Sequence, residues 1–199
     1  METPNASSED AEKSRRSPKA ERARKKARMD ALTFSEPGSL VKLLVGQDNP
    51  PIELHIHKEV VCQRSPVFRA AFCGNFSEAQ SHTYPLRHID ESTAKLLMQW
   101  LYTQKLVVAQ LKDDWTEDAK LADEEDRTLI DLWVLADELQ MPALQNTTIK
   151  AIHDVGEKTE MLMSNTNKER ILNKTADGSQ LRLYISHYIA STREPGDYK

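Results

Sequence analysis

A change of hydrophobic period inside residues 52–76 constrains the fold more than any other feature of the sequence. At its start apolar and polar residues alternate, as in a strand with one buried face: Ile52, Leu54 and Ile56 against Glu53, His55 and His57. Apolar residues then recur three or four positions apart as far as Phe72, which is helical spacing. Ser65 and Pro66 begin a second helix, because serine caps helices well and proline fits the first turn. A strand that leads directly into two helices, without a glycine-rich loop, indicates packing rather than phosphate binding.

The flanking segments complete a small sheet. Residues 39–46 are a short apolar run suited to a buried strand, and Gly46 to Pro51 reads as the hairpin connection to the strand that begins at Ile52. Residues 83–89 predict a third strand, which Pro85 places at an edge because proline cannot donate to a ladder. Residues 106–111 predict one more short strand.

Helical periods return on both sides of an acidic stretch. A helix is expected from Thr93 to about Gln104, another over residues 129–140, and a third from Pro142 until Gly156 ends it. Residues 35–156 therefore predict one α+β domain, a small three-stranded sheet capped by about five α-helices. Residues 157–199 predict a partly helical C-terminal extension, with a last amphipathic helix near Leu181–Ile189.

The charged segments lie outside the apolar blocks. Nine Lys or Arg residues fall between Lys13 and Arg28, and residues 1–34 predict a disordered basic tail. This tail contains two basic clusters, Arg15 and Arg16, then Arg24, Lys25 and Lys26. They fit a nuclear-import signal, a contact with nucleic-acid phosphates, or a tail that only increases solubility. Without an apolar leader or a membrane span, we expect the protein in the nucleus and/or the cytoplasm and not at a membrane.

Eight acidic residues against one lysine between Asp113 and Asp126 predict a solvated insertion loop over residues 113–127. Neutral replacements from Asp123 to Asp126 should then leave stability nearly unchanged. The only two cysteines, Cys62 and Cys73, lie in apolar helical stretches, which predicts buried, reduced thiols.

No set of residues combines an acid, a base and a nucleophile, so the sequence predicts no enzyme, no cofactor and no metal. His55 and His57 share one face of a strand and would need His82, His88 or Cys62 to complete a metal site. The better interpretation is that His57 forms a local hydrogen bond at the junction of strand and helix. Ser65 is interpreted as a helix cap rather than a nucleophile.

Two motifs carry a family resemblance. The run Leu54-x-Ile56-His57-Lys58-x-x-Val61-x-x-x-Ser65-x-x-Phe68, followed by Phe72, Phe76 and Glu78, resembles the central signature of the BTB/POZ domain. Leu96-Leu97-x-x-Trp100-Leu101-Tyr102-Thr103 resembles the end of a later helix of the same family, and the likeness covers about residues 39–155. The C-terminal segment resembles that of short fungal BTB proteins.

The resemblance implies a non-enzymatic protein-interaction module that self-associates, serves as an adaptor for a partner such as a cullin-type ubiquitin ligase, or does both. The residues that it suggests for partner binding are Leu40, Lys58, Tyr102 and Gln104. Leu40 stands where many self-associating members have an aspartate, and no helix is evident before the first strand. Cullin docking would use the helix 93–104, its following loop and the helix 129–140. The alternative is a nuclear regulator whose basic arm contacts nucleic acid while the folded domain recruits proteins.

Overall fold

The computed structural model describes residues 32–160 and 163–192, and the chain divides into two compact units, Met1–Ser35 and Glu36–Lys199. In the first unit the hydroxyl oxygens of Thr33 and Ser35 lie 2.9 Å apart. Everything below concerns the second unit. Among the described residues it contains a three-stranded sheet and eight α-helices, so the predicted α+β class is confirmed.

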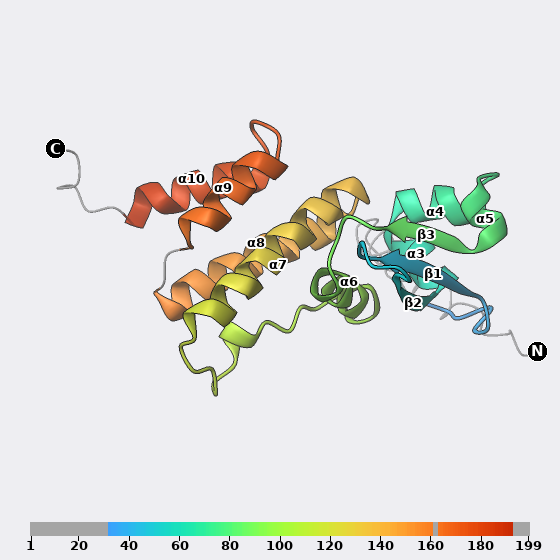
Figure 1. Ribbon diagram of the computed structural model, residues 1–199, viewed down its shortest axis with the longest axis horizontal. Helices are drawn as coiled ribbons and strands as arrows, with labels where there is room; N and C mark the ends of the chain where they lie inside the picture. Colours follow the sequence, from blue (N-terminus) through green and yellow to red (C-terminus); the bar gives the residue numbers. More distant parts are fainter. Residues whose placement is uncertain (1–31, 161–162, 193–199) are drawn as a thin grey trace, which may run out of the picture. The chain divides into compact units, whose positions relative to one another are not determined.

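The sheet has the strand order β2-β1-β3 (Figure 1). Strands β1 (Leu40–Val45) and β2 (Ile52–His57) pair antiparallel in the predicted hairpin, with Leu40 opposite His57. The turn needs Gly46, whose φ of 82° lies in the left-handed region that residues with a side chain avoid. Strand β3 (Thr83–Leu86) runs parallel to β1 at the edge, as Pro85 predicts. Val41, Leu43 and Val45 alternate into the core.

The strand predicted over residues 106–111 is wrong. The chain there has no regular structure until a single 3-10 turn, η1 (Ala109–Leu111). The backbone N–H groups of Ala109 and Gln110 both donate to the carboxylate of Glu125, at 2.6 and 2.9 Å. These donors are therefore occupied and do not contribute to a strand ladder.

Four helices follow the hairpin, three before β3 in the sequence and one after it: α3 (Lys58–Arg64), α4 (Pro66–Cys73), α5 (Ser77–Ser81) and α6 (Glu91–Thr103). The predicted caps are confirmed, since Ser65 accepts a hydrogen bond from the N–H of Phe68 and Asp90 accepts one from that of Thr93. The Phe68 and Phe72 rings lie beside each other in the core between α4 and the sheet, and Tyr84 meets the Phe68 ring edge-on with 5.1 Å between centroids.

Helices α7 (Ala119–Glu138) and α8 (Pro142–Thr159) form a second layer and pack side by side (Figure 1). Helix α7 begins at Ala119 rather than at Leu129, so the predicted acidic loop over residues 113–127 is wrong for its second half. Asp118 caps this helix by accepting the N–H groups of Lys120 and Leu121, and Ala122 is buried. Helix α8 likewise continues past Gly156, where the sequence predicts its end.

The C-terminal extension packs against this layer as two helices, α9 (Asn165–Lys174) and α10 (Gln180–Thr192). Ile171, Leu181 and Ile185 are buried in one cluster with Trp133 and Ile152 of α7 and α8. Gly156 allows the close approach of α10, because a Cβ atom at that position would lie 2.5 Å from the Tyr188 hydroxyl oxygen. None of the described helices combines the length and the apolar composition needed to cross a membrane.

Candidate functional site

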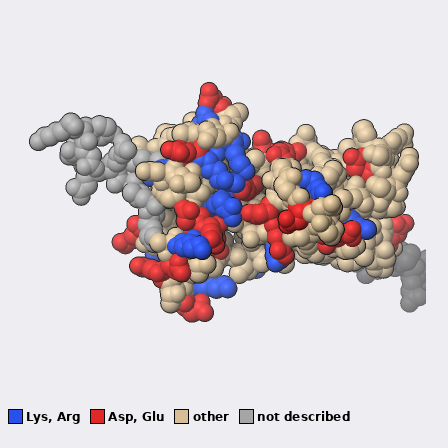
Figure 2. All heavy atoms as spheres, viewed as in Figure 1, with Lys and Arg blue, Asp and Glu red and all other residues tan. Residues whose placement is uncertain are grey.

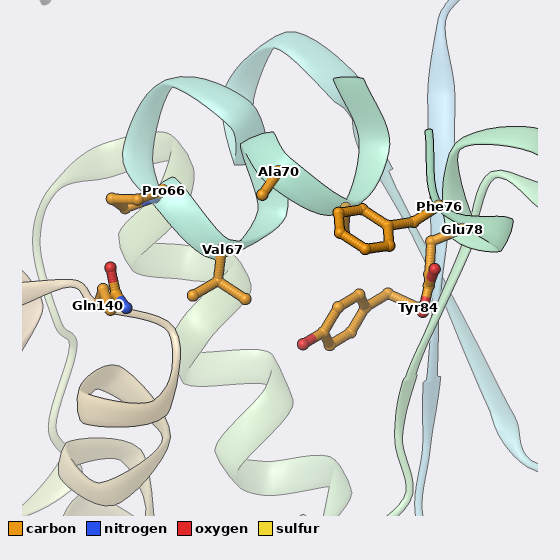
Figure 3. Close-up of a pocket in the computed structure, with 8 residues that line it drawn as sticks. Pro66, Val67, Ala70, Phe76, Glu78, Tyr84 and Gln140 are labelled. Atoms are coloured by element: carbon orange, nitrogen blue, oxygen red, sulfur yellow. The ribbon is translucent and has the colours of Figure 1, made fainter. Parts of the chain in front are cut away.

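An open apolar groove lies between α4, the segment leading into α5, strand β3 and the turn between α7 and α8. Its volume is about 360 Å³. Figure 3 shows the side chains of Val67, Phe76 and Tyr84 directed toward one space, with Pro66 and Gln140 toward one end and Glu78 at the other. The walls are mostly carbon, and the polar groups are at the ends. Such a groove suits an apolar side chain flanked by polar groups of a partner.

Phe76 is the most exposed large hydrophobic residue in the described part of the chain, with 59% of its surface accessible. Gly74 ends α4, and a Cβ atom at Gly74 would lie 2.4 Å from the carbonyl oxygen of Ala70. The chain therefore turns away from the helix direction, and Phe76 precedes α5 instead of continuing the buried face that holds Phe72. Glycine and asparagine before an isolated aromatic residue are the sequence signal for this exposure, and Phe76 is not among the predicted site residues.

Ser65 holds the two sides of the groove together. Its hydroxyl oxygen accepts the N–H of Phe68 at 3.1 Å, and the hydroxyl donates to the carbonyl oxygen of Leu139 at 2.7 Å. This side chain is fully buried, so it acts as the predicted helix cap and also ties the start of α4 to the end of α7. Gln140 consequently lies beside Pro66 at the end of the groove (Figure 3).

Tyr84 supplies the floor of the groove. Burial, and then the negative charges of Glu78 and Glu138, raise the pKa of its phenol. The hydroxyl therefore remains protonated at neutral pH and is able to donate a hydrogen bond. In Figure 2 charged side chains gather over the helical end on the left, whereas much of the surface over the sheet and α4 on the right is uncharged.

The structure brings three of the four predicted partner-binding residues to one corner. Leu40 is 44% exposed and pairs with His57, while the backbone N–H of Lys58 donates to Ser39. The Tyr102 hydroxyl oxygen lies 2.8 Å from His57 Nδ1 and 3.2 Å from the His57 backbone nitrogen. Gln104 does not join this corner through its side chain, which donates to the carbonyl oxygen of Trp100 in its own helix. The binding role of these four residues stays a prediction.

The histidines are distributed rather than clustered. His57 lies at the junction of β2 and α3, and its ring nitrogen Nδ1 is 2.8 Å from the hydroxyl oxygen of Tyr102, a partner distant in sequence instead of the local one predicted. His88 pairs with Glu138 at 2.8 Å. Within the described residues, no group of three or more His, Cys, Asp or Glu side chains is arranged to hold a metal ion. The predicted import or nucleic-acid residues Arg15, Arg16, Arg24, Lys25 and Lys26 lie outside the described residues.

The acidic residues at the start of α7 make contacts within the fold. These contacts conflict with the expectation that neutral replacements from Asp123 to Asp126 leave stability nearly unchanged. Asp123 accepts a hydrogen bond from Asn167 at 2.9 Å, and Glu125 binds two backbone N–H groups. Asp126 is half-buried and accepts a weak hydrogen bond from Gln110 at 3.3 Å. Burial is the main cause that raises the pKa of Asp126 to about 6.

We expect Asp126→Asn to stabilise the protein at pH 7 by about 1–3 kcal/mol and to have little effect near pH 4. At a pH between 3.8, the ordinary pKa of the group, and about 6, its raised pKa, the Asp126 carboxyl keeps its proton in the folded protein and has lost it in the unfolded chain. Protonation therefore favours the folded state, and this contribution disappears as the pH rises through about 6, whereas asparagine carries no charge at any pH. Urea melts at several pH values measure the difference, with the exposed Glu124→Gln as control. An equal difference at pH 4 and pH 7 would contradict this assignment.

Comparison with known proteins identifies the domain. A family model described as "BTB/POZ domain" matches residues 39–154. Kelch-like protein 28 of Mus musculus and of Homo sapiens are each 32% identical over 59 residues, which covers 30% of this chain and 10% of each relative. A solved structure described as "Structure of the BTB (Tramtrack and Bric a brac) domain of human Gigaxonin" aligns with a TM-score of 0.40 and 15% identity, covering 75% of this chain and 98% of that one. Because the family model spans more than half of the chain, the protein belongs to the BTB/POZ domain family, whose domain is a protein–protein interaction module.

Proposed function

We propose that this protein is a non-enzymatic adaptor that docks a cullin-type ubiquitin-ligase scaffold through the groove around Phe76. The observation that carries the proposal is the exposure of the Phe76 ring beside an open apolar groove. The partner class comes from the use that the family resemblance implies. The groove supplies the surface, and the rest of the domain supplies the support that keeps it rigid.

The groove has the features of a protein-binding hot spot. Two aromatic side chains, Phe76 and Tyr84, border it together with small and branched apolar residues of α4. Its shape is fixed before binding, because α4 is tied to α7 by Ser65 and is packed on the core through Phe68 and Phe72. A preformed groove loses little conformational entropy when a partner binds, which favours affinity.

The groove around Phe76 is not the surface predicted from the sequence for cullin docking. The predicted contacts lie on α6, on the loop after it and on the second half of α7. The groove shares only Gln140 with that prediction. Five residues of α6 are buried, including Leu97, Trp100 and Leu101, so only the opposite face of that helix is open to a partner.

The proposal predicts that Phe76→Asp weakens binding of the full chain to a cullin N-terminal domain by at least about tenfold, because a charge would replace an aromatic anchor in an apolar groove. Calorimetric titration against a panel of purified cullin N-terminal domains measures the affinity. The substitution should leave the fold intact, since the ring is 59% exposed. A thermal melt of the variant checks this.

The matched control is Leu172→Asp on α9. Leu172 is 54% exposed, so the change places the same charge on a similarly exposed apolar position away from the groove. We expect its affinity to equal that of the unmodified chain. Absence of binding to every member of the panel, or an equal loss in both variants, would refute the proposed function.

A further inference from the structure

The two cysteines of the chain lie in contact, although they are on different helices. Cys62 is on α3 and Cys73 is the last residue of α4, and their sulfur atoms are 3.4 Å apart. Both are free thiols, Cys62 buried and Cys73 exposed. The sequence-based expectation of two buried thiols is therefore wrong for Cys73, because Gly74 ends the helix beside it and leaves its side chain at the surface.

The bend between the two helices holds this contact in place. Arg69 Nε on α4 donates to the carbonyl oxygen of Cys62 on α3 at 2.8 Å, and Ser65 caps the second helix at the bend. A disulfide needs sulfur atoms about 2.0 Å apart. A small movement at the exposed end of α4 therefore suffices to join the sulfur atoms, and neither helix has to unfold.

The two thiols have different roles because their surroundings differ. Oxidants in solution reach Cys73, whereas Cys62 lies behind it in the core. Burial, and then the hydrogen bond and charge of Cys73, raise the pKa of the Cys62 thiol to about 12, so Cys62 stays protonated at neutral pH. The exposed thiol is thus the site of first attack, and the buried thiol is held next to its product.

We propose that Cys62 and Cys73 form an oxidation site that takes a hydroperoxide as substrate and closes an intramolecular disulfide. The Cys73 thiolate attacks one peroxide oxygen, the O–O bond breaks, and hydroxide leaves, which produces a sulfenic acid on Cys73. The Cys62 sulfur then displaces the sulfenic hydroxyl group, and its proton leaves with that group as water. In total the two thiols lose two protons and two electrons, and one hydrogen peroxide becomes two water molecules.

Treating the full chain with hydrogen peroxide tests this. After unfolding and alkylation, we expect the number of reactive thiols to fall from two to zero per chain, with an intact mass lower by about 2 Da for the two hydrogens lost. Dithiothreitol should restore both thiols. A non-reducing gel should show a monomeric chain, because the bond closes within one molecule.

Cys73→Ser is the matched variant, since the position is exposed and the change replaces one sulfur by oxygen. It should keep one reactive thiol after the same treatment and show no loss of mass. The inference is overturned if the unmodified chain retains two thiols, gains oxygen on Cys73 without losing Cys62, or forms disulfide-linked dimers. None of these outcomes depends on cullin binding, so the site is tested separately from the proposed function.

Discussion

Replacing Phe72 with alanine is expected to lower the free energy of unfolding by about 3–5 kcal/mol, the usual cost of deleting a buried aromatic side chain. The ring is 1% exposed, and its centroid lies 6.0 Å from that of Phe68 and 6.2 Å from that of Tyr84. The deletion leaves a cavity between α4 and the sheet that neighbouring rings fill only in part. Urea denaturation followed by circular dichroism measures the change.

Phe76→Ala is the matched control for this prediction. It makes the same chemical change four positions later in the chain, where the ring is 59% exposed instead of buried. Its effect on the free energy of unfolding should stay within about 0.5 kcal/mol, as for other surface substitutions. Equal losses in the two variants would mean that the buried face of α4 is assigned incorrectly.

The parts of the fold that depend on neighbours in the sequence are predictable from the sequence. Alternation in residues 52–57 predicts β2 with its bounds, and Ser65 with Pro66 predicts the bend between α3 and α4. These signals are local, because a strand's period, a helix cap and a proline each act on adjacent residues. The motif spacing that resembles the BTB/POZ family adds the order of the elements, which the family match confirms.

What the sequence does not predict depends on contacts between distant segments. Gly156 resembles a helix end, yet it lies inside α8 because the Tyr188 side chain packs against it. The acidic residues Glu125 and Asp126 resemble a solvated loop, yet Glu125 binds the backbone of η1 and Asp126 is half-buried at the side of α7. Composition alone does not reveal such partners, since glycine and carboxylates are common in both settings.

The same limit applies to the candidate site. The contact of Cys73 with Cys62 and the exposure of Phe76 both follow from the way Gly74 ends α4. The groove also requires Gln140, which Ser65 brings next to α4 through Leu139. A motif identifies Ser65 as a cap, but only the three-dimensional arrangement shows that its hydroxyl donates to a residue 74 positions later.

An ion cluster around the buried carboxylate of Asp131 attaches the C-terminal extension to the domain. Asp131 on α7 accepts two hydrogen bonds from Arg170, at 2.8 and 2.6 Å, and one from Lys174 at 2.8 Å. Burial opposes the charge of Asp131, but the hydrogen bonds and positive charges of the two α9 residues outweigh it and lower the pKa of this carboxyl. The cluster therefore stabilises the folded state above the ordinary pKa of 3.8, and this contribution is lost as the pH falls through the lowered value.

Asp131→Asn is expected to destabilise the protein by about 2–3 kcal/mol at pH 7, because it removes the carboxylate that binds both cations of α9. Removing one partner of a fully buried ion pair costs about 3–5 kcal/mol. The loss of stability in Asp131→Asn is at the lower end or smaller, because Arg170 and Lys174 are partly exposed. Hydrogen exchange should show faster exchange in α9 before the sheet is affected, since Asp131 binds two side chains of α9. The control is Asp137→Asn, an exposed position on the same helix, which should change stability by no more than about 0.5 kcal/mol. If the Asp131 variant unfolds at the same urea concentration as the unmodified chain, the ion cluster does not hold the extension on the domain. The hydrophobic packing of Ile171, Leu181 and Ile185 and the hydrogen bond of Asn167 to Asp123 then suffice.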